Sequence, residues 1–333
     1  MKMKLKSTSF APLLTVGMVA LASGGLQAQT VLRFASEAAR SDPQTAGGEK
    51  MNELLKAKTN GALEVKVFSD SSLGNAQAAI SSARGGTIDI VISGSSNYTG
   101  IVPLLGVIDI PFIFKDTAHA YRVLDGKVGK EIMDKLDQFG LKGLAYWDTG
   151  WRELTNSRQP VHVPADIKGL KVRTNGSPAH NETWKLLGAN PVPMPIGELY
   201  TALEMKTVDA QEQSLGLLYS GKFYEVQKYL SMTNHAYSAL LVAMNKAKFD
   251  ALPPAQQKAI VEAAVEAGNY QRKLNNDNTI KIIADVKKAG LQVVEKVDPA
   301  PFLEITKPVR LMFTSKYGGE EYIKAIDAER NVQ

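Results

Sequence analysis

Short β-rich runs alternate with longer amphipathic segments along this chain, and this rhythm constrains its fold more than any other feature. The β-rich runs lie at 31–35, 63–68, 88–92 and 141–147, and helical patterns lie at 44–58 and 76–84. Such alternation is typical of α/β proteins, in which a helix returns the chain to the start of the next parallel strand. The sequence therefore predicts an α/β fold with mainly parallel strands.

The chain is long enough for two domains, and a second α/β unit begins near Gly150. We expect one domain from residues 29–149 plus about 238–277, and another from 150–237 plus about 278–333. A crossing near Gly150 would place Trp151 and Arg152 at the mouth of an interdomain cleft, where ligand sites are common.

A long helix is predicted between Pro254 and Ala289, because Pro253 and Gly290 supply start and stop signals around an apolar pattern of helical spacing. An unbroken helix of this length would measure roughly 54 Å at about 1.5 Å per residue, enough to span both lobes. A kink at residues 275–278, where helix propensity drops, is the alternative.

The N-terminus has the pattern of a cleaved secretory signal. Lys2, Lys4 and Lys6 precede an apolar run that ends near Ala28, and the run is shorter than the roughly 20 residues that a membrane span requires. Cleavage after Ala28 would remove three of the lysines and no acid, so the net charge would fall from +5 to +2. A nearly neutral exported protein has no general attraction for nucleic acid.

No cysteine is present, which excludes disulfides, thiol nucleophiles and a lipid anchor on cysteine. His119, His162, His180 and His235 are scattered without metal-ligand spacing, and no hydrolase or phosphate-binding motif occurs. We therefore expect neither an enzyme nor a cofactor, and an unanchored, monomeric protein in the periplasm.

Arg152 and Arg173 lie about twenty residues apart in strand-like or turn-like sequence. Guanidinium stays charged and presents a planar fork that matches a carboxylate in two-point contact. Two such side chains on rigid elements predict a buried site for an organic acid.

Over nearly all of the mature sequence, the chain resembles the extracytoplasmic solute receptors of TRAP (tripartite ATP-independent periplasmic) transporters. The motifs that carry this resemblance are Trp-Asp-Thr-Gly-Trp-Arg-Glu-Leu-Thr-Asn-Ser at 147–157, Pro-Ala-Asp-Ile-Lys-Gly-Leu-Lys-Val-Arg at 164–173, Leu-Gly-Ala-Asn-Pro-Val-Pro-Met at 187–194, Glu-Leu-Tyr-Thr-Ala-Leu at 198–203, Val-Asp-Ala-Gln-Glu at 208–212 and Lys-Phe-Tyr-Glu-Val-Gln-Lys-Tyr at 222–229. The resemblance implies a two-lobed periplasmic-binding-protein-like fold with an interdomain cleft.

The resemblance also implies residue roles. Arg173 would form the principal salt bridge to the substrate carboxylate, and Arg152 would make a second cationic contact. Where the family usually has Val-Asp-Gly-Gln-Glu-Asn, this chain has Ala210 and Gln213 in place of the Gly and Asn. Gln213 keeps an amide but is one methylene longer, so we expect a reshaped pocket.

Further lining residues are expected among aromatic and amide side chains. Trp151 and Tyr98 are the first candidates, followed by Asn97 and Tyr237. The stretch 73–77, where relatives often carry an acidic residue, offers only Asn75 and Gln77. Neutral hydrogen bonds to hydroxyl groups are therefore expected, and the lack of an acidic candidate argues against amino-sugar acids.

The implied function is capture of an organic acid and its delivery to the membrane subunits of a TRAP permease. Hydroxylated sugar acids such as uronates or aldonates are the leading candidates, followed by C4-dicarboxylates and by aromatic or branched hydroxy acids. A receptor of an ATP-driven importer and a secreted enzyme that processes sugar acids are the rival classes.

Overall fold

The computed structural model describes Met1 and residues 29–332. The predicted signal peptide, residues 1–28, lies outside the described residues apart from Met1. Within the described residues, no helix combines the length and apolarity needed to cross a bilayer.

The described residues form one mixed sheet of nine strands. Its strands are β1 (Thr30–Ser36), β2 (Leu63–Phe68), β3 (Ile90–Gly94), β4 (Leu141–Asn156), β5 (Lys171–Thr174), β6 (Asn190–Pro193), β7 (Ala210–Ser214), β8 (Tyr229–Asn245) and β9 (Gln292–Val294). The order is β2-β1-β3-β8-β4-β7-β5-β6, and β9 pairs with β8. Two parallel groups therefore flank a central pair, β8 and β4.

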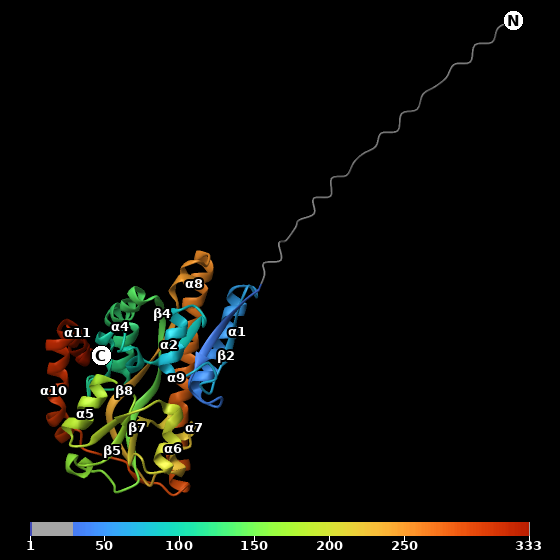
Figure 1. Ribbon diagram of the computed structural model, residues 1–333. Coiled ribbons are helices and arrows are strands. Elements are labelled where there is room, and N and C mark those ends of the chain that lie inside the picture. Colours follow the sequence, from blue (N-terminus) through green and yellow to red (C-terminus); the bar gives the residue numbers. More distant parts are fainter. Residues whose placement is uncertain (2–28, 333) are drawn as a thin grey trace.

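Helices cover both faces of this sheet (Figure 1). They are α1 (Pro43–Lys58), α2 (Ala76–Arg84), α3 (Thr117–Asp125), α4 (Lys127–Met133), α5 (Pro178–Leu186), α6 (Leu199–Glu204), α7 (Leu215–Ser220), α8 (Lys246–Asp250), α9 (Pro254–Lys288), α10 (Ala300–Lys316) and α11 (Glu320–Ala328). The start of α1 is set by Asp42, whose carboxylate accepts from the backbone N–H of Gln44, and by Pro43 in the first turn.

The molecule has two lobes joined by the central strands. We call β1–β3 with α1 and α2 the first lobe, and β5–β7 with α5–α7 the second lobe. Strands β4 and β8 and helix α9 extend along both lobes (Figure 1). Helix α9 is continuous over 35 residues, so the alternative of a break at 275–278 is not observed.

Alternating side chains of the central strands supply separate cores on the two faces of the sheet. In β8, Leu241 and Ala243 join one cluster, while Val242 and Met244 join the cluster beneath α1 and α9. Burial of both faces explains the continuous apolar run at residues 239–244 of β8.

Trp147 lies between α1 and α9 and fixes how closely they approach. A methyl group on Gly268 would come within 2.5 Å of the Trp147 ring, and one on Gly47 would also come within 2.5 Å. The indole N–H donates to the carbonyl of Ala264 at 2.8 Å. Small residues are therefore required where the two helices cross this ring.

The predicted α/β class is confirmed, but the prediction of mainly parallel strands missed the antiparallel centre. The pairs β3–β8, β8–β4 and β4–β7 are all antiparallel. Strand β4 also runs to Asn156, well beyond the predicted run. Its register shifts between Asp148 and Gly150, and Gly150 has φ of 88°, so this residue meets a backbone requirement that favours glycine.

The domain boundaries stay a prediction. The expected crossing near Gly150 falls inside β4, at the register shift. At the C-terminal end, α10 contacts α5, whereas α11 packs against α4 and contributes Ile323 and Ile326 to the core beside the first lobe.

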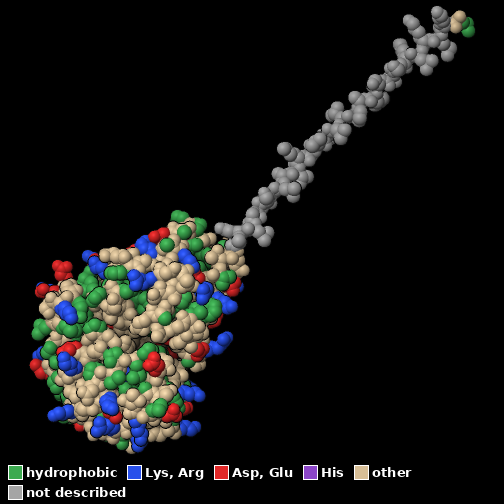
Figure 2. Space-filling view, in the orientation of Figure 1, with side chains coloured by type: hydrophobic (Ala, Val, Ile, Leu, Met, Phe, Trp, Pro, Cys, Tyr) green, Lys and Arg blue, Asp and Glu red, His purple; other side chains and the backbone are tan. Residues whose placement is uncertain are grey.

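On the face shown in Figure 2, acidic and basic side chains are scattered over both lobes.

Candidate functional site

A cavity of about 280 Å³ lies where the two lobes meet. It is bordered by the carboxyl ends of β1 and β3 from the first lobe and of β5 and β6 from the second, because parallel strands present these ends at one edge. Its polar and charged lining residues are Glu37, Gln44, Gln77, Ser93, Ser96, Asn97, Arg152, Arg173, Asn175, Gln213 and Ser238.

Arg173, on β5, is 2% exposed and lines the cavity. Its Nε and Nη2 donate to the carbonyl oxygen of Met194 at 3.0 and 2.7 Å. Its Nη1 is buried without a hydrogen-bond partner among the described residues. A buried donor without a partner is costly, so this atom needs an acceptor that the protein does not supply.

Burial, together with the nearby charge of Arg152, lowers the pKa of Arg173 to about 10, against the attraction of Glu212 and Glu37. The guanidinium therefore remains positive at neutral pH. Among the described residues, no carboxylate forms an ion pair with it, so its charge is available to an anion.

Arg152 also lines the cavity, but its charge is already paired. Its Nε and Nη2 bind the carboxylate of Glu212, Nη2 also donates to the Glu212 carbonyl at 2.8 Å, and Nη1 donates to Ser238 at 3.1 Å. The five N–H groups of the guanidinium thus keep one free donor. Arg152 lies opposite Ser214 of β7, which places Glu212, two residues along, on the same face.

Glu212 is the centre of a buried polar cluster that sequence spacing did not reveal. Burial raises the pKa of its carboxyl, but the charge of Arg152 and a hydrogen bond from His235 outweigh burial and bring the pKa below the usual range. His235 lies 3.2 Å from Glu212, and the hydroxyl of Thr233 contacts its other ring nitrogen. Burial lowers the pKa of both histidines, so they are neutral at neutral pH.

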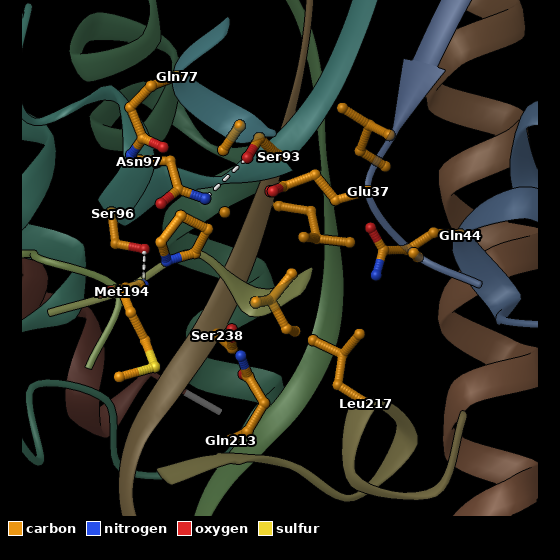
Figure 3. A pocket seen from close by; sticks show the side chains of 18 of the residues that line it. Glu37, Gln44, Gln77, Ser93, Ser96, Asn97, Met194, Gln213, Leu217 and Ser238 are labelled. Carbon is orange, nitrogen blue, oxygen red and sulfur yellow. Dashed lines mark hydrogen bonds between the residues drawn. The ribbon is translucent and has the colours of Figure 1, made fainter. Parts of the chain in front are cut away.

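Three other predicted residues also line the cavity. Gln213 accepts from the backbone N–H of Ser214 at 3.2 Å, and its amide nitrogen is directed toward Ser238 in Figure 3. Asn97 donates to Ser93 at 2.8 Å, and Gln77 lies beside it on the first-lobe wall. The structure therefore brings Arg173, Arg152 and Gln213 together with first-lobe amides.

Four predicted residues do not line this cavity. Tyr98 is fully buried in the apolar core and donates to the Leu241 carbonyl. Tyr237 is also buried and hydrogen-bonds Asp148. Trp151 packs edge to face on Tyr237 and donates to Thr117, and Asn75 caps α2 by accepting from Ala78. Local sequence shows that such residues are near the cleft but not which way they point.

Glu37 is the lining residue that sequence reasoning missed. It directly follows β1, and its carboxylate points into the cavity in Figure 3. The expectation that the pocket has no acidic side chain is therefore wrong, and with it the argument against amino-sugar acids. Its position after the carboxyl end of a predicted strand was the available signal.

Hydrogen bonds connect the lobes around the cavity. Asn175 donates to Ser96 at 2.6 Å, as drawn in Figure 3. On the α1 side, Ser220 of α7 donates to Asp42 at 2.9 Å. These bonds require the lobes to be close together.

A two-lobed α/β fold with a polar, cationic cavity between its lobes defines a solute receptor of the periplasmic-binding-protein type. The profile of bacterial extracellular solute-binding protein family 7 matches residues 34–316. The chain belongs to this family, which is one of solute receptors rather than enzymes.

Relatives and solved structures agree with this assignment. The chain is 50% identical over 327 residues to the 2,3-diketo-L-gulonate-binding periplasmic protein YiaO of Escherichia coli, covering 98% of this chain and 99% of that protein. A TRAP periplasmic solute-binding protein of a Polaromonas species, bound to D-erythronate, matches with 36% identity and a TM-score of 0.88 over 90% of this chain and 99% of that one. The sugar acid binding protein of Advenella mimigardefordensis, in complex with galactonate, matches with 32% identity and a TM-score of 0.86 over the same shares.

Proposed function

We propose that this protein is the periplasmic receptor of a TRAP transporter and captures a hydroxylated sugar acid, an aldonate or a uronate, between its lobes. Arg173 is the principal carboxylate ligand, and Arg152 adds one N–H through its free donor. The supporting observation is that Arg173 lines the cavity, while its buried Nη1 has neither a hydrogen-bond acceptor nor a paired carboxylate among the described residues.

The rest of the wall suits hydroxyl groups. Gln77, Asn97 and Gln213 present amides, and Ser93 and Ser96 present hydroxyls. Such groups both donate and accept, as polyhydroxylated ligands require. The names of the relatives point the same way, since 2,3-diketo-L-gulonate, D-erythronate and galactonate all carry a carboxylate and hydroxyls.

Domain closure completes the site, because Arg173 belongs to the second lobe and the amides at 77 and 97 belong to the first. A ligand that converts a mostly open receptor into a mostly closed one must favour the closed state by about 5 kcal/mol. Contacts from both lobes provide this preference only after closure. The closed receptor then docks on the membrane permease subunits and releases its cargo.

The test is isothermal titration of Arg173 variants with aldonates and uronates. Micromolar binding corresponds to about 8 kcal/mol, and removal of one partner of a buried ion pair costs about 3–5 kcal/mol. Arg173→Ala should therefore nearly abolish binding. Arg173→Lys keeps the charge but loses the planar fork, so we expect at least about tenfold weaker binding. Unchanged affinity in Arg173→Lys would rule out a two-point clamp.

A further inference from the structure

The charged side chains of the cavity are divided between the lobes. Arg173 and Arg152 lie on β5 and β4, whereas Glu37 follows β1 of the first lobe. In Figure 3, Glu37 points into the cavity from the wall that also carries Ser93. No lysine, arginine or histidine forms an ion pair with Glu37 among the described residues, so no cationic side chain there neutralises its carboxylate.

The ionic pairs also limit how many anionic groups the cavity can take. Arg152 is neutralised by Glu212, which leaves the Arg173 guanidinium as the unpaired cation of the wall. One carboxylate on the ligand would satisfy Arg173. A second carboxylate would find no further cation, and at the first-lobe wall it would face Glu37.

The carboxylate of Glu37 differs from the neighbouring amide side chains because it cannot donate a hydrogen bond. Ionised Glu37 is an acceptor only, so it binds hydroxyl groups and repels carboxylates, whereas Gln77 and Asn97 can adapt to either. At the first-lobe wall, Glu37 is therefore the side chain whose charge can distinguish a hydroxyl group from a carboxylate on the ligand.

We propose that Glu37 determines specificity by accepting hydrogen bonds from ligand hydroxyls distant from the carboxylate, so that the receptor selects polyhydroxylated monocarboxylates and rejects dicarboxylates. This inference rests on the proposed function, in which Arg173 holds the ligand carboxylate. It adds the residue that recognises the opposite end of the ligand.

The surroundings of Glu37 set the pH at which it acts as an ionised acceptor. Burial raises the pKa of Glu37, while a backbone hydrogen bond from Ala76 and the charge of Arg173 oppose that rise. Because the net shift is upward, the fraction of charged Glu37 increases with pH, and its effect on ligand choice should be largest at mildly alkaline pH.

The test compares ligands that differ only at the end remote from the carboxylate. Galactonate ends in a hydroxymethyl group where galactarate has a second carboxylate, and gluconate and glucarate form a second such pair. Isothermal titration of wild type should show a preference for the aldonate of at least about tenfold, because like charges in a desolvated contact are strongly unfavourable. Glu37→Gln should reduce this preference by about tenfold or more, chiefly through tighter aldarate binding.

Two further variants separate this inference from the proposed function. Glu37→Asp keeps the charge and should keep the preference for the aldonate, even if both ligands bind more weakly. Arg173→Lys should weaken both ligands of a pair to a similar extent. If Arg173→Lys has that effect but Glu37→Gln leaves the ratio unchanged, Glu37 does not set specificity, although the carboxylate clamp stands.

Other outcomes are equally decisive. Equal weakening of aldonate and aldarate by Glu37→Gln would assign Glu37 a structural role only. Tighter binding of 6-amino-6-deoxygluconate than of gluconate by wild type would mean that Glu37 recognises an ammonium group rather than a hydroxyl. Failure of every aldonate and uronate to bind wild type would overturn both proposals.

Discussion

Arg152 and Glu212 form a buried two-point ion pair, with Nη2 and Oε1 2.9 Å apart and both side chains almost completely shielded from solvent. The pair holds β4 against β7 behind the cavity. Because Glu212 occupies most of the Arg152 donors, Arg173 is the better candidate for the principal anion ligand. The same pairing makes Glu212 a stability determinant, although it does not line the cavity.

Glu212→Gln should lower the free energy of unfolding by about 3–5 kcal/mol, because it leaves the Arg152 charge buried without its partner. Urea denaturation would show this as a lower midpoint with an unchanged slope. Glu262→Gln is the matched control, since Glu262 pairs with Lys58 on the surface and should have almost no effect. Equal losses of unfolding free energy in the two variants would show that the buried pair contributes no more to stability than the surface pair.

Gln213→Glu should weaken binding of sugar acids by at least about tenfold, because it introduces a negative charge on the wall shared with Arg173. Gln213→Asn keeps the amide but shortens its reach, and a lost neutral hydrogen bond predicts a change of only about two- to tenfold. Titration of both variants with the same aldonate makes the comparison. Undiminished affinity in Gln213→Glu would place the ligand carboxylate away from β7.

Ser220→Ala should weaken ligand binding by about two- to tenfold, because the hydrogen bond to Asp42 joins the lobes and favours their closed arrangement. Titration calorimetry measures the affinity, and stopped-flow fluorescence should show faster ligand release. Ser72→Ala is the control, because Ser72 bonds to Ser69 within the first lobe. An identical response of the two variants would contradict a role in closure.

Glu153 should make the protein less stable as pH rises above the acid range. Burial raises the pKa of Glu153 to about 8, against hydrogen bonds from the backbone of Asn234 and Thr233. The native state therefore holds a proton that the unfolded state loses near its ordinary pKa of 4.5. The stability from this proton is complete below that value and is lost as pH rises toward about 8.

Glu153→Gln should flatten this part of the pH profile and raise the free energy of unfolding at the alkaline end by roughly 1 kcal/mol or more. Thermal or urea denaturation at several pH values provides the measurement. A variant that keeps the slope of the wild-type profile would show that Glu153 is ionised in the native protein at neutral pH.

Periodicity predicted the first lobe closely, because its elements are short, regular and separated by clear turn signals. The predicted strand at 63–68 and helix at 76–84 coincide with β2 and α2. The central strands were harder, since β8 is buried on both faces and its nearly continuous apolar run carries no alternation that would reveal its length or direction.

At the site, the sequence indicated the residues that carry a distinctive chemical group. It did not indicate which side chains point toward the cavity and which point toward the core. Arg173 and Gln213 line the cavity as predicted, whereas Tyr98 faces the core because the turn after β3 directs it toward Leu241. Glu37 was missed because a lone acidic residue after a short strand has no motif. Only the fold brings it into the same cavity as Arg173.

Since β4 and β8 each run along both halves, the two halves share one ladder of backbone hydrogen bonds. A fragment cut near Gly150 would divide β4. The backbone N–H and C=O groups of the remaining strand edge would then lack the neighbouring strand that pairs with them. Neither half is therefore an independent building block. Heat and denaturant should melt the receptor in a single cooperative step, and engineered exchange of one half between relatives requires both long strands to be transferred intact.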